Sequence, residues 1–362
     1  MLDDLLRCSK LCGMRVWTWL AVGMVGSVAW GQQGGSGPQP GQAGQAPFTL
    51  QTKSNLVLVP TELATKKGEM IYGLTPEQFV VEDNGVPQTI KLDEDTDALG
   101  LSLVVVVQCS RAAFAQFDNM KGLAAMVDDV TGGAPRQVAV VSYGADPTLI
   151  TDFTASPDKL ADALGQLQPC DDGAARTLDA VDYADALFDD NKATASSHNR
   201  RAILLISETR DHGSHHKPAR VIANLGRTNT VVDSVSFNPG KTELLGSLLH
   251  GQYGPGPVGL LVMAVEALHK KVPHTLAALS GGEYTNFTTQ KGFDEGVHRL
   301  ANRIHNFYLI SFQPSGLTGV AAEPGLHRIT VKVPDYPKAR VSARLTYYAG
   351  DQAPPDVPES EK

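Results

Sequence analysis

The hydrophobic pattern of the chain is organised around one apolar run. Residues Leu101 to Val107 are apolar except for Ser102, and most of them are β-branched. A run without alternating polar residues is typical of a strand that is buried on both faces in a parallel sheet. Gln108, Cys109 and Ser110 follow directly, where the chain must turn toward a helix. In open α/β sheets, ligands bind in the crevice at this carboxyl end of the strands.

Around this run the periodicity alternates between short apolar segments and segments with helical spacing. The predicted strands are Leu101–Val107, Gln137–Tyr143, Ala202–Ser207 and Thr230–Phe237, and the predicted helices are Phe114–Val130, Pro157–Leu167, Leu178–Asp190 and Lys217–Arg227. This alternation predicts an α/β fold with a doubly wound, mostly parallel sheet that is covered by helices on both faces. Thr148–Thr151 is predicted as a short antiparallel edge strand, and residues 239–261 as an inserted loop. Three later segments also have helical periodicity: Leu260–Lys270, Val272–Ser280 and Phe293–His305.

Both flanks of this α/β unit have strand patterns. The N-terminal ones are Thr49–Pro60, Met70–Leu74 and Phe79–Leu92, and the C-terminal ones are Phe307–Gln313, His327–Val333 and Ala339–Tyr348. Asn84-Gly85 is a strong hairpin signal, because both residues tolerate positive φ. Neither flank is long enough to close a large core alone, so we predict that residues 48–97 and 306–349 pack together as a small sandwich-like unit beside an α/β domain at 98–305. The polar tail, residues 350–362, is expected to be disordered.

The N-terminus has the pattern of a signal peptide. Three basic residues precede the apolar segment Val16–Ala29, which is shorter than the roughly 20 residues of a membrane span. We predict a signal peptide at 1–31 with cleavage before Gln32, and either Met1 or Met14 as the start. Residues 32–47, rich in Gly, Gln and Pro, are predicted as a flexible linker. The mature protein is then expected in the periplasm, the cell envelope or the medium, without a membrane span.

The amino-acid composition and the net charge limit the classes of function that this chain can have. A hydrophobic content of 42% and a charged content of 19% indicate a globular chain. The net charge is −8 and the sequence contains no Lys/Arg-rich block, which excludes a nucleic-acid partner because phosphates need a basic surface. Cys109 and Cys170 are the only cysteines after signal cleavage, and neither has the spacing of a zinc site.

The order of these segments resembles a von Willebrand factor type A domain. Its flanks look like those of the exported VWFA-related proteins common in acidobacteria, in the stretch Tyr72-Gly-Leu-Thr-Pro-Glu-Gln-Phe-Val-Val-Glu-Asp-Asn-Gly85 and in the closing strands Tyr308-Leu-Ile-Ser-Phe-Gln-Pro314 and Val341-Ser-Ala-Arg-Leu-Thr-Tyr-Tyr348. The resemblance covers roughly residues 48–349. It implies a protein–protein interaction or adhesion module that is not an enzyme and whose protein partner the sequence does not identify.

The resemblance also implies where a metal-ion-dependent adhesion site would lie. The family's D-x-S-x-S motif falls on residues 108–112, its threonine on Thr177 and its aspartate on Glu208. Gln108 replaces a carboxylate, Ala112 has no oxygen to offer and Glu208 is one methylene longer than Asp. Losing a charge and a ligand should weaken Mg²⁺ binding severely. We therefore expect a degenerate site, no metal cofactor, and a metal-independent surface that uses Ser110, Arg111 and Glu208.

Three alternatives stay open at this stage. The module could still depend on Mg²⁺ and tolerate Gln108. It could instead be an enzyme that uses Cys109 with the histidines of Asp211-His-Gly-Ser-His-His216. Because the family pattern brings the loops of Cys109 and Cys170 together at the cation, the resemblance implies a disulfide between them; the alternative is two unrelated thiols.

Overall fold

The computed structural model describes residues 56–93, 99–132, 135–195, 197, 199–237, 256–314 and 322–357. The predicted signal peptide (1–31) and linker (32–47) lie outside these residues, as do most of the predicted inserted loop and the last five residues of the predicted tail. Among the helices of the described ranges, none combines the length and the apolar character that a membrane crossing requires.

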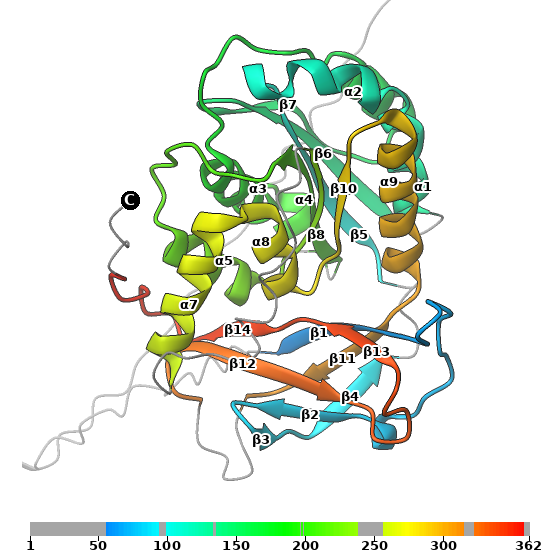
Figure 1. The fold of residues 1–362 in the computed structure, drawn as a ribbon, viewed down its shortest axis with the longest axis vertical. Helices are drawn as coiled ribbons and strands as arrows, with labels where there is room; N and C mark the ends of the chain where they lie inside the picture. Colours follow the sequence, from blue (N-terminus) through cyan, green and yellow to red (C-terminus); the bar gives the residue numbers. More distant parts are fainter. Residues whose placement is uncertain are drawn as a thin grey trace, which may run out of the picture. The chain divides into compact units, whose positions relative to one another are not determined.

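The α/β part is built on a six-stranded sheet with the strand order β10-β9-β8-β5-β6-β7 (Figure 1). These strands are β5 (Leu101–Gln108), β6 (Arg136–Tyr143), β7 (Pro147–Thr154), β8 (Arg200–Glu208), β9 (Val231–Phe237) and β10 (Tyr284–Phe287). Every neighbouring pair is parallel except β6 and β7. The predicted doubly wound, mostly parallel sheet is confirmed, and the antiparallel edge strand predicted at Thr148–Thr151 lies within β7.

Residues of β5 are buried on both faces of the sheet, which explains why its sequence does not alternate. Val104 and Val106 pack into one hydrophobic core, whereas Leu103 and Val105 pack into a second core. The helices of the first core are α3 (Thr177–Asp190), α5 (Pro218–Thr228), α7 (Pro257–Lys270) and α8 (Val272–Ser280). The helices of the second core are α1 (Leu123–Thr131), α2 (Pro157–Gly165) and α9 (Gln290–His305). Figure 1 shows α1 and α9 on the opposite side of the sheet from α3, α5 and α8.

The two flanks form the predicted sandwich-like unit, with two four-stranded sheets ordered β13-β1-β11-β4 and β14-β12-β2-β3. Its strands are β1 (Val57–Ala64), β2 (Val80–Asp83), β3 (Val86–Pro87), β4 (Ile90–Asp93), β11 (Tyr308–Phe312), β12 (Gly325–Lys332), β13 (Arg340–Ala343) and β14 (Thr346–Ala349). Asn84 and Gly85, both at positive φ, join β2 to β3 in the predicted hairpin. The α/β part is an insertion between β4 and β11, which pair with each other.

The two parts meet through closely packed backbone and one buried guanidinium. A Cβ atom on Gly226 of α5 would lie 2.8 Å from the backbone nitrogen of Tyr348 in β14. Arg344, between β13 and β14, is 1% exposed and donates to the carbonyl of Leu225 at 2.9 Å and to Oδ1 of Asn229 at 3.0 Å. Burial lowers the pKa of Arg344 to about 10, although the charge of Asp185 opposes this shift. Leu225 belongs to the last turn of α5, so the guanidinium lies at the negative end of a helix dipole.

Several elements differ from the sequence prediction. The helix predicted at Phe114–Val130 is a 3₁₀ helix, η2 (Arg111–Met120), followed by α1, and the break falls at Gly122, whose φ is 95°. β10 was not predicted, because its four residues include polar Thr285 and Asn286. Shorter elements also lie outside the predicted set: η1 (Pro76–Gln78) and α4 (Lys192–Ala195).

Part of the tail does not fit the expectation of disorder. Arg227 donates to the carbonyl oxygens of Gly350 and Gln352, and Val357 packs against the core that contains α5. Lys217 pairs with Asp356 at 2.5 Å. These contacts hold residues 350–357 against the α/β part. The sequence did not indicate them, because the partners of these carbonyl groups and of Val357 lie far away along the chain.

Candidate functional site

The side chain of Gln108 links the carboxyl ends of β5 and β8. Its amide nitrogen, Nε2, donates to Oγ of Ser110 at 2.7 Å and to Oε1 of Glu208 at 2.8 Å. Its oxygen, Oε1, accepts from the backbone nitrogen of Glu208 at 2.8 Å. Gln108 is fully buried, so water does not compete for these three hydrogen bonds. The structure thus brings together three of the five residues that the sequence placed at the predicted metal site.

Thr177 lies nearby at the first residue of α3, but its hydroxyl is engaged elsewhere. Its Oγ1 and the hydroxyl of Tyr143 are 3.1 Å apart, and both side chains are buried. Burial raises the pKa of Tyr143, although its hydrogen bond with Thr177 opposes this shift, so the phenol stays protonated as a hydrogen-bonding group. Ala112, the fifth predicted position, is exposed on η2 and contributes no oxygen.

A disulfide joins the loop after β5 to the loop before α3. Cys109 and Cys170 are bonded, with their α-carbons 5.1 Å apart, so the predicted disulfide is confirmed. The backbone nitrogen of Cys170 also donates to the carbonyl of Cys109 at 2.8 Å. In the same loop Asp172 accepts from the backbone nitrogen of Ala145 at 2.9 Å. The segment leading to Thr177 is therefore fixed both covalently and by hydrogen bonds, and Cys109 is not available as a thiolate nucleophile while the bond is intact.

The exposed side of this edge carries a guanidinium and an aromatic ring. Arg111 is paired with Asp171 at 2.8 Å, and their side chains are 66% and 96% exposed. Phe114, on the same 3₁₀ helix, is 70% exposed. The sequence prediction named Arg111 as a possible partner contact and placed Phe114 only as the first residue of a helix, so it did not identify this exposed ring. We call Arg111 and Phe114, which are exposed, together with the partly exposed Glu208 and the buried Ser110, the β5–β8 face.

The histidine cluster after β8 serves to hold its own loop. Nδ1 of His215 lies 3.0 Å from Asp179 in α3, and Nδ1 of His216 lies 2.8 Å from Asp182. Burial opposes ionisation of Asp179, but hydrogen bonds from the backbone of His215 and His216 outweigh it, so the pKa of Asp179 is lowered. His212 instead lies 3.2 Å from Glu208. Over the described ranges, no three His, Cys, Asp or Glu side chains are arranged to hold a metal ion.

A comparison with protein-family models matches the central region of the chain. Residues 103–210 match the family model of the von Willebrand factor type A domain. This span contains Gln108, Ser110, Thr177 and Glu208. No curated protein matches the sequence.

Solved structures with a similar fold have low sequence identity. Proximal thread matrix protein 1 from the mussel byssus is 12% identical, with a TM-score of 0.41, and the match covers 62% of this chain and 50% of the mussel protein. BatB from Bacteroides thetaiotaomicron is 12% identical with a TM-score of 0.38, covering 56% of this chain and all of that one. The SpRpn10 VWA domain is 11% identical with a TM-score of 0.37, covering 56% and 95%. The chain thus spans about half the length of the mussel protein.

Proposed function

We propose that this protein is a non-enzymatic protein-binding module that recognises its partner through the β5–β8 face without a metal ion. The observation that carries this proposal is the amide of Gln108. Its Nε2 donates to Ser110 and Glu208, which are two of the oxygen-bearing residues that the family resemblance assigns to a cation. A hydrogen-bond donor that belongs to the chain itself takes the place between them, so the two loops are connected without an ion.

The donor set does not fit a divalent cation. Mg²⁺ prefers oxygen ligands in nearly octahedral geometry, with carboxylates to balance its charge. Here a cation would have to displace an amide nitrogen that bonds to both oxygens, and the only carboxylate of the five predicted positions is Glu208. Oε2 of that carboxylate already lies 3.2 Å from Nε2 of His212. Both hydrogen bonds of the amide would have to break before an ion could bind between these two oxygens.

The exposed residues of the face support protein recognition. Arginine and aromatic residues are enriched at the centres of protein–protein interfaces. The pair between Arg111 and Asp171 is exposed, and such pairs contribute only about 0–1 kcal/mol, so Arg111 can exchange Asp171 for a carboxylate of the partner at little cost. The disulfide and the hydrogen bonds of Gln108 hold the surrounding loops in place, which reduces the entropy that binding would cost.

The metal part of the proposal is tested by thermal unfolding with Mg²⁺, Mn²⁺ or EDTA. A ligand at about 100 times its dissociation constant stabilises a protein by about 2.7 kcal/mol. We expect no shift of the wild-type melting temperature at millimolar Mg²⁺. The double variant Gln108→Asp, Ala112→Ser restores a carboxylate and a hydroxyl and should gain an EDTA-sensitive shift. A wild-type shift that EDTA reverses would instead support a metal-dependent adhesion module.

The recognition part is tested by crosslinking and pull-down from the source cell envelope, with identification of the captured protein. Phe114→Ser and Arg111→Glu should each lose the captured partner while keeping the wild-type melting temperature, since both side chains are exposed. Val258→Ser on α7 is the matched control, because Val258 is also an exposed apolar residue (58%) on a different element. Equal capture by all three variants would place the binding surface elsewhere.

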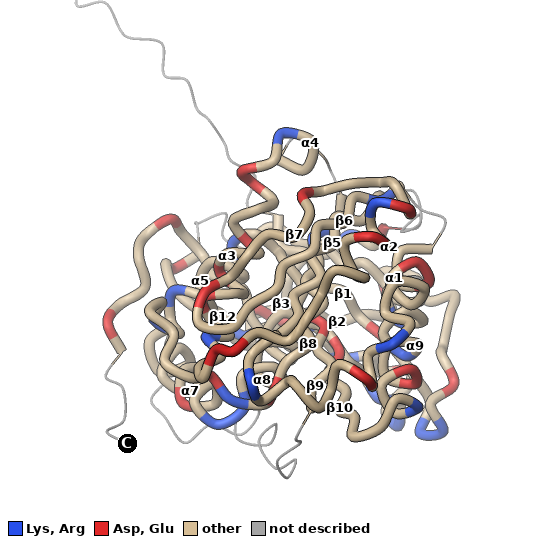
Figure 2. The backbone as a smooth tube through the Cα atoms, turned by 90° about the horizontal axis from the view of Figure 1, so that it is seen from above, with Lys and Arg blue, Asp and Glu red and all other residues tan. Residues whose placement is uncertain are grey.

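We propose that the protein is exported, with removal of residues 1–31. The basic and apolar pattern of that segment and the disulfide both support this, because disulfides persist mainly in oxidising compartments. Figure 2 shows acidic and basic positions interspersed along the described backbone, which agrees with a protein partner rather than a nucleic acid. The intact mass of the protein from the envelope fraction should correspond to a chain that begins at Gln32, and it should increase by the mass of two hydrogen atoms on reduction. A chain that retains residues 1–31 would contradict export by this route.

A further inference from the structure

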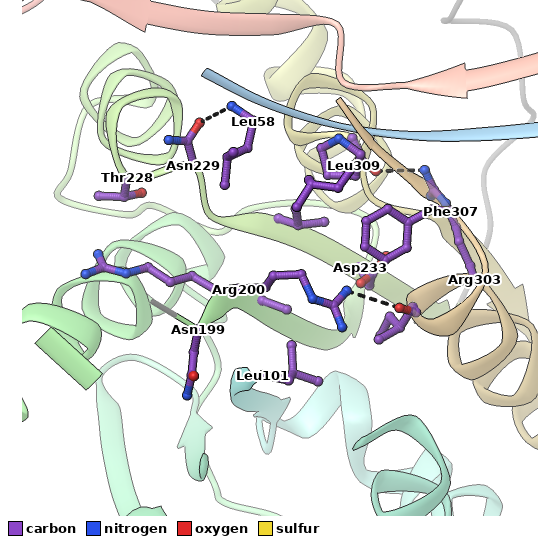
Figure 3. A pocket seen from close by; sticks show the side chains of 16 residues that line it. Leu58, Leu101, Asn199, Arg200, Thr228, Asn229, Asp233, Arg303, Phe307 and Leu309 are labelled. Atoms are coloured by element: carbon purple, nitrogen blue, oxygen red, sulfur yellow. Dashed lines mark hydrogen bonds between the residues drawn. The ribbon is translucent and has the colours of Figure 1, made fainter. Parts of the chain in front are cut away.

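A partly enclosed cavity of about 150 Å³ lies at the opposite end of the central sheet from the β5–β8 face (Figure 3). It is lined by the first residues of β5 and β8, by the ends of α5 and α9, and by β1 and β11 of the sandwich-like unit. Leu101 lines the cavity, whereas Gln108, at the other end of the same strand, is hydrogen-bonded to Ser110 and Glu208 of the β5–β8 face. The cavity is therefore a separate site. Its volume is comparable to that of a protein cavity known to hold a benzene molecule.

One part of the cavity wall is apolar. Figure 3 shows Leu58, Leu309 and Phe307 from the sandwich-like side and Leu101 from β5 around the same space. Leu101 and Leu309 are 2% and 3% exposed, so their side chains are held in place by the surrounding core. An apolar group that enters this space is removed from water, which is favourable by roughly 25 cal/mol per Å² in general. The wall thus suits a small ring or a short alkyl chain.

The remaining wall is polar. It includes Arg200, Arg201 and Arg303, with Asp233 as the only carboxylate among the lining residues. The guanidinium of Arg201 pairs with Asp189 at 2.7 Å, and that of Arg303 pairs with Glu62 at 3.3 Å and with Glu283 at 3.4 Å, so carboxylates outside the lining balance these two charges. Arg200 donates to the carbonyl of Ile304 at 3.1 Å and lies 4.9 Å from the centre of the Phe307 ring, so it marks the boundary between the apolar and polar walls.

The charge of Asp233 is already engaged by its neighbours. Its Oδ1 accepts from the backbone nitrogen of Glu283 at 2.7 Å. Burial raises the pKa of Asp233 to about 6, and the charge of Arg303 opposes this shift. Guanidinium groups carry several donors and no acceptor. A head group that accepts hydrogen bonds therefore fits beside the guanidinium of Arg200, whereas the positive charge of an ammonium group would be repelled by it.

We propose that this cavity binds a small amphipathic carboxylate, with its apolar body against Leu101, Phe307 and Leu309 and its carboxylate toward Arg200. The ligand would contact both the α/β part and the sandwich-like unit, since its apolar walls come from both. This proposal is independent of the function proposed for the β5–β8 face.

The test uses benzoate as the probe and the full mature chain labelled at leucine methyl groups for NMR. Two control compounds carry the same ring: benzylamine has a cationic head group, and toluene has no polar head group. We expect benzoate to shift the methyl signals of Leu58, Leu101 and Leu309 saturably at millimolar concentrations and to raise the melting temperature. Toluene should bind more weakly, and benzylamine should leave these signals unchanged. Ala202→Leu fills the cavity and should abolish the benzoate effect, whereas Ala186→Leu, the same change at an exposed position of α3, should retain it.

Three results would overturn the proposal. They are the absence of saturable shifts with benzoate, an equal or stronger effect of benzylamine, and shifts confined to leucines outside the cavity. The probe series needs only the unaltered protein, so it decides the matter even if Ala202→Leu fails to fold. Loss of partner capture by Phe114→Ser has no bearing on it, which keeps the two proposals distinguishable.

Discussion

The close approach of α5 to β14 predicts opposite effects for the same substitution at two helical glycines. In Gly226→Ala the new Cβ would lie 2.8 Å from the nitrogen and from Cβ of Tyr348, whereas non-bonded carbon atoms prefer about 3.5–4.0 Å. Overpacking of this kind costs about 1–3 kcal/mol. The higher helix propensity of Ala offsets this cost by about 0.8–1.0 kcal/mol. We expect a net loss of up to about 2 kcal/mol in the free energy of unfolding.

Gly165→Ala is the matched control. A Cβ on Gly165, the last residue of α2, meets no heavy atom within 4 Å, so only the gain in helix propensity and in chain stiffness remains. It should stabilise the protein by about 0.4–1 kcal/mol. Urea unfolding followed by far-UV circular dichroism measures both variants against the wild type. If Gly226→Ala proves as stable as Gly165→Ala, the contact between α5 and β14 is not as tight as described, and the reasoning fails.

Two further predictions concern the disulfide and one buried histidine. Replacing Cys109 and Cys170 together by Ala should lower the free energy of unfolding by about 4 kcal/mol, since the bond closes a loop with a sequence separation of 61, and an unchanged urea midpoint would contradict this. Burial opposes protonation of His327, but hydrogen bonds to Asp83 at 2.8 Å and to the carbonyl of Glu323 outweigh it and raise its pKa. A raised folded-state pKa gives stability that is fully present below the unfolded value of about 6.5 and is lost as the pH rises through the folded value. Stability measured against pH should show this fall in the wild type, and the same fall in His327→Gln would refute the assignment.

The fold was largely predictable because its signals are local. The apolar run of β5, which does not alternate with polar residues, indicated a strand buried on both faces, and Asn84-Gly85 indicated the hairpin between β2 and β3. The elements that sequence reasoning missed lack such a signal. β10 is short and partly polar, and it is a strand because it pairs with β9, which lies far from it in the sequence. The break at Gly122 requires a positive φ at this residue. The helical periodicity of the surrounding sequence gives no sign of it.

The candidate site was predictable in its residues but not in its contacts. The resemblance placed Gln108 and Glu208 at the same edge, 100 positions apart, but which atoms meet depends on distances that no pattern encodes. That an amide nitrogen would bridge two oxygens followed only from the geometry. Arg344 was missed for a similar reason. The sequence placed Arg344 inside one predicted strand, Ala339–Tyr348, where a lone arginine is expected at the surface, and its burial depends on α5 ending beside it.

The position of the α/β part between β4 and β11 has a consequence for how the chain folds. β1 pairs with β11 and β13, so Val57 meets Phe312 only after some 250 residues of intervening chain have been made. Closing so long a loop is entropically costly, and contacts this distant in sequence form late. If the inserted part folds first, it brings Asp93 and Leu309 together and shortens the effective loop. During synthesis, β1 therefore stays an unpaired apolar strand until β11 has been made, and in a chain that ends before residue 308 it would have neither β11 nor β13 to pair with.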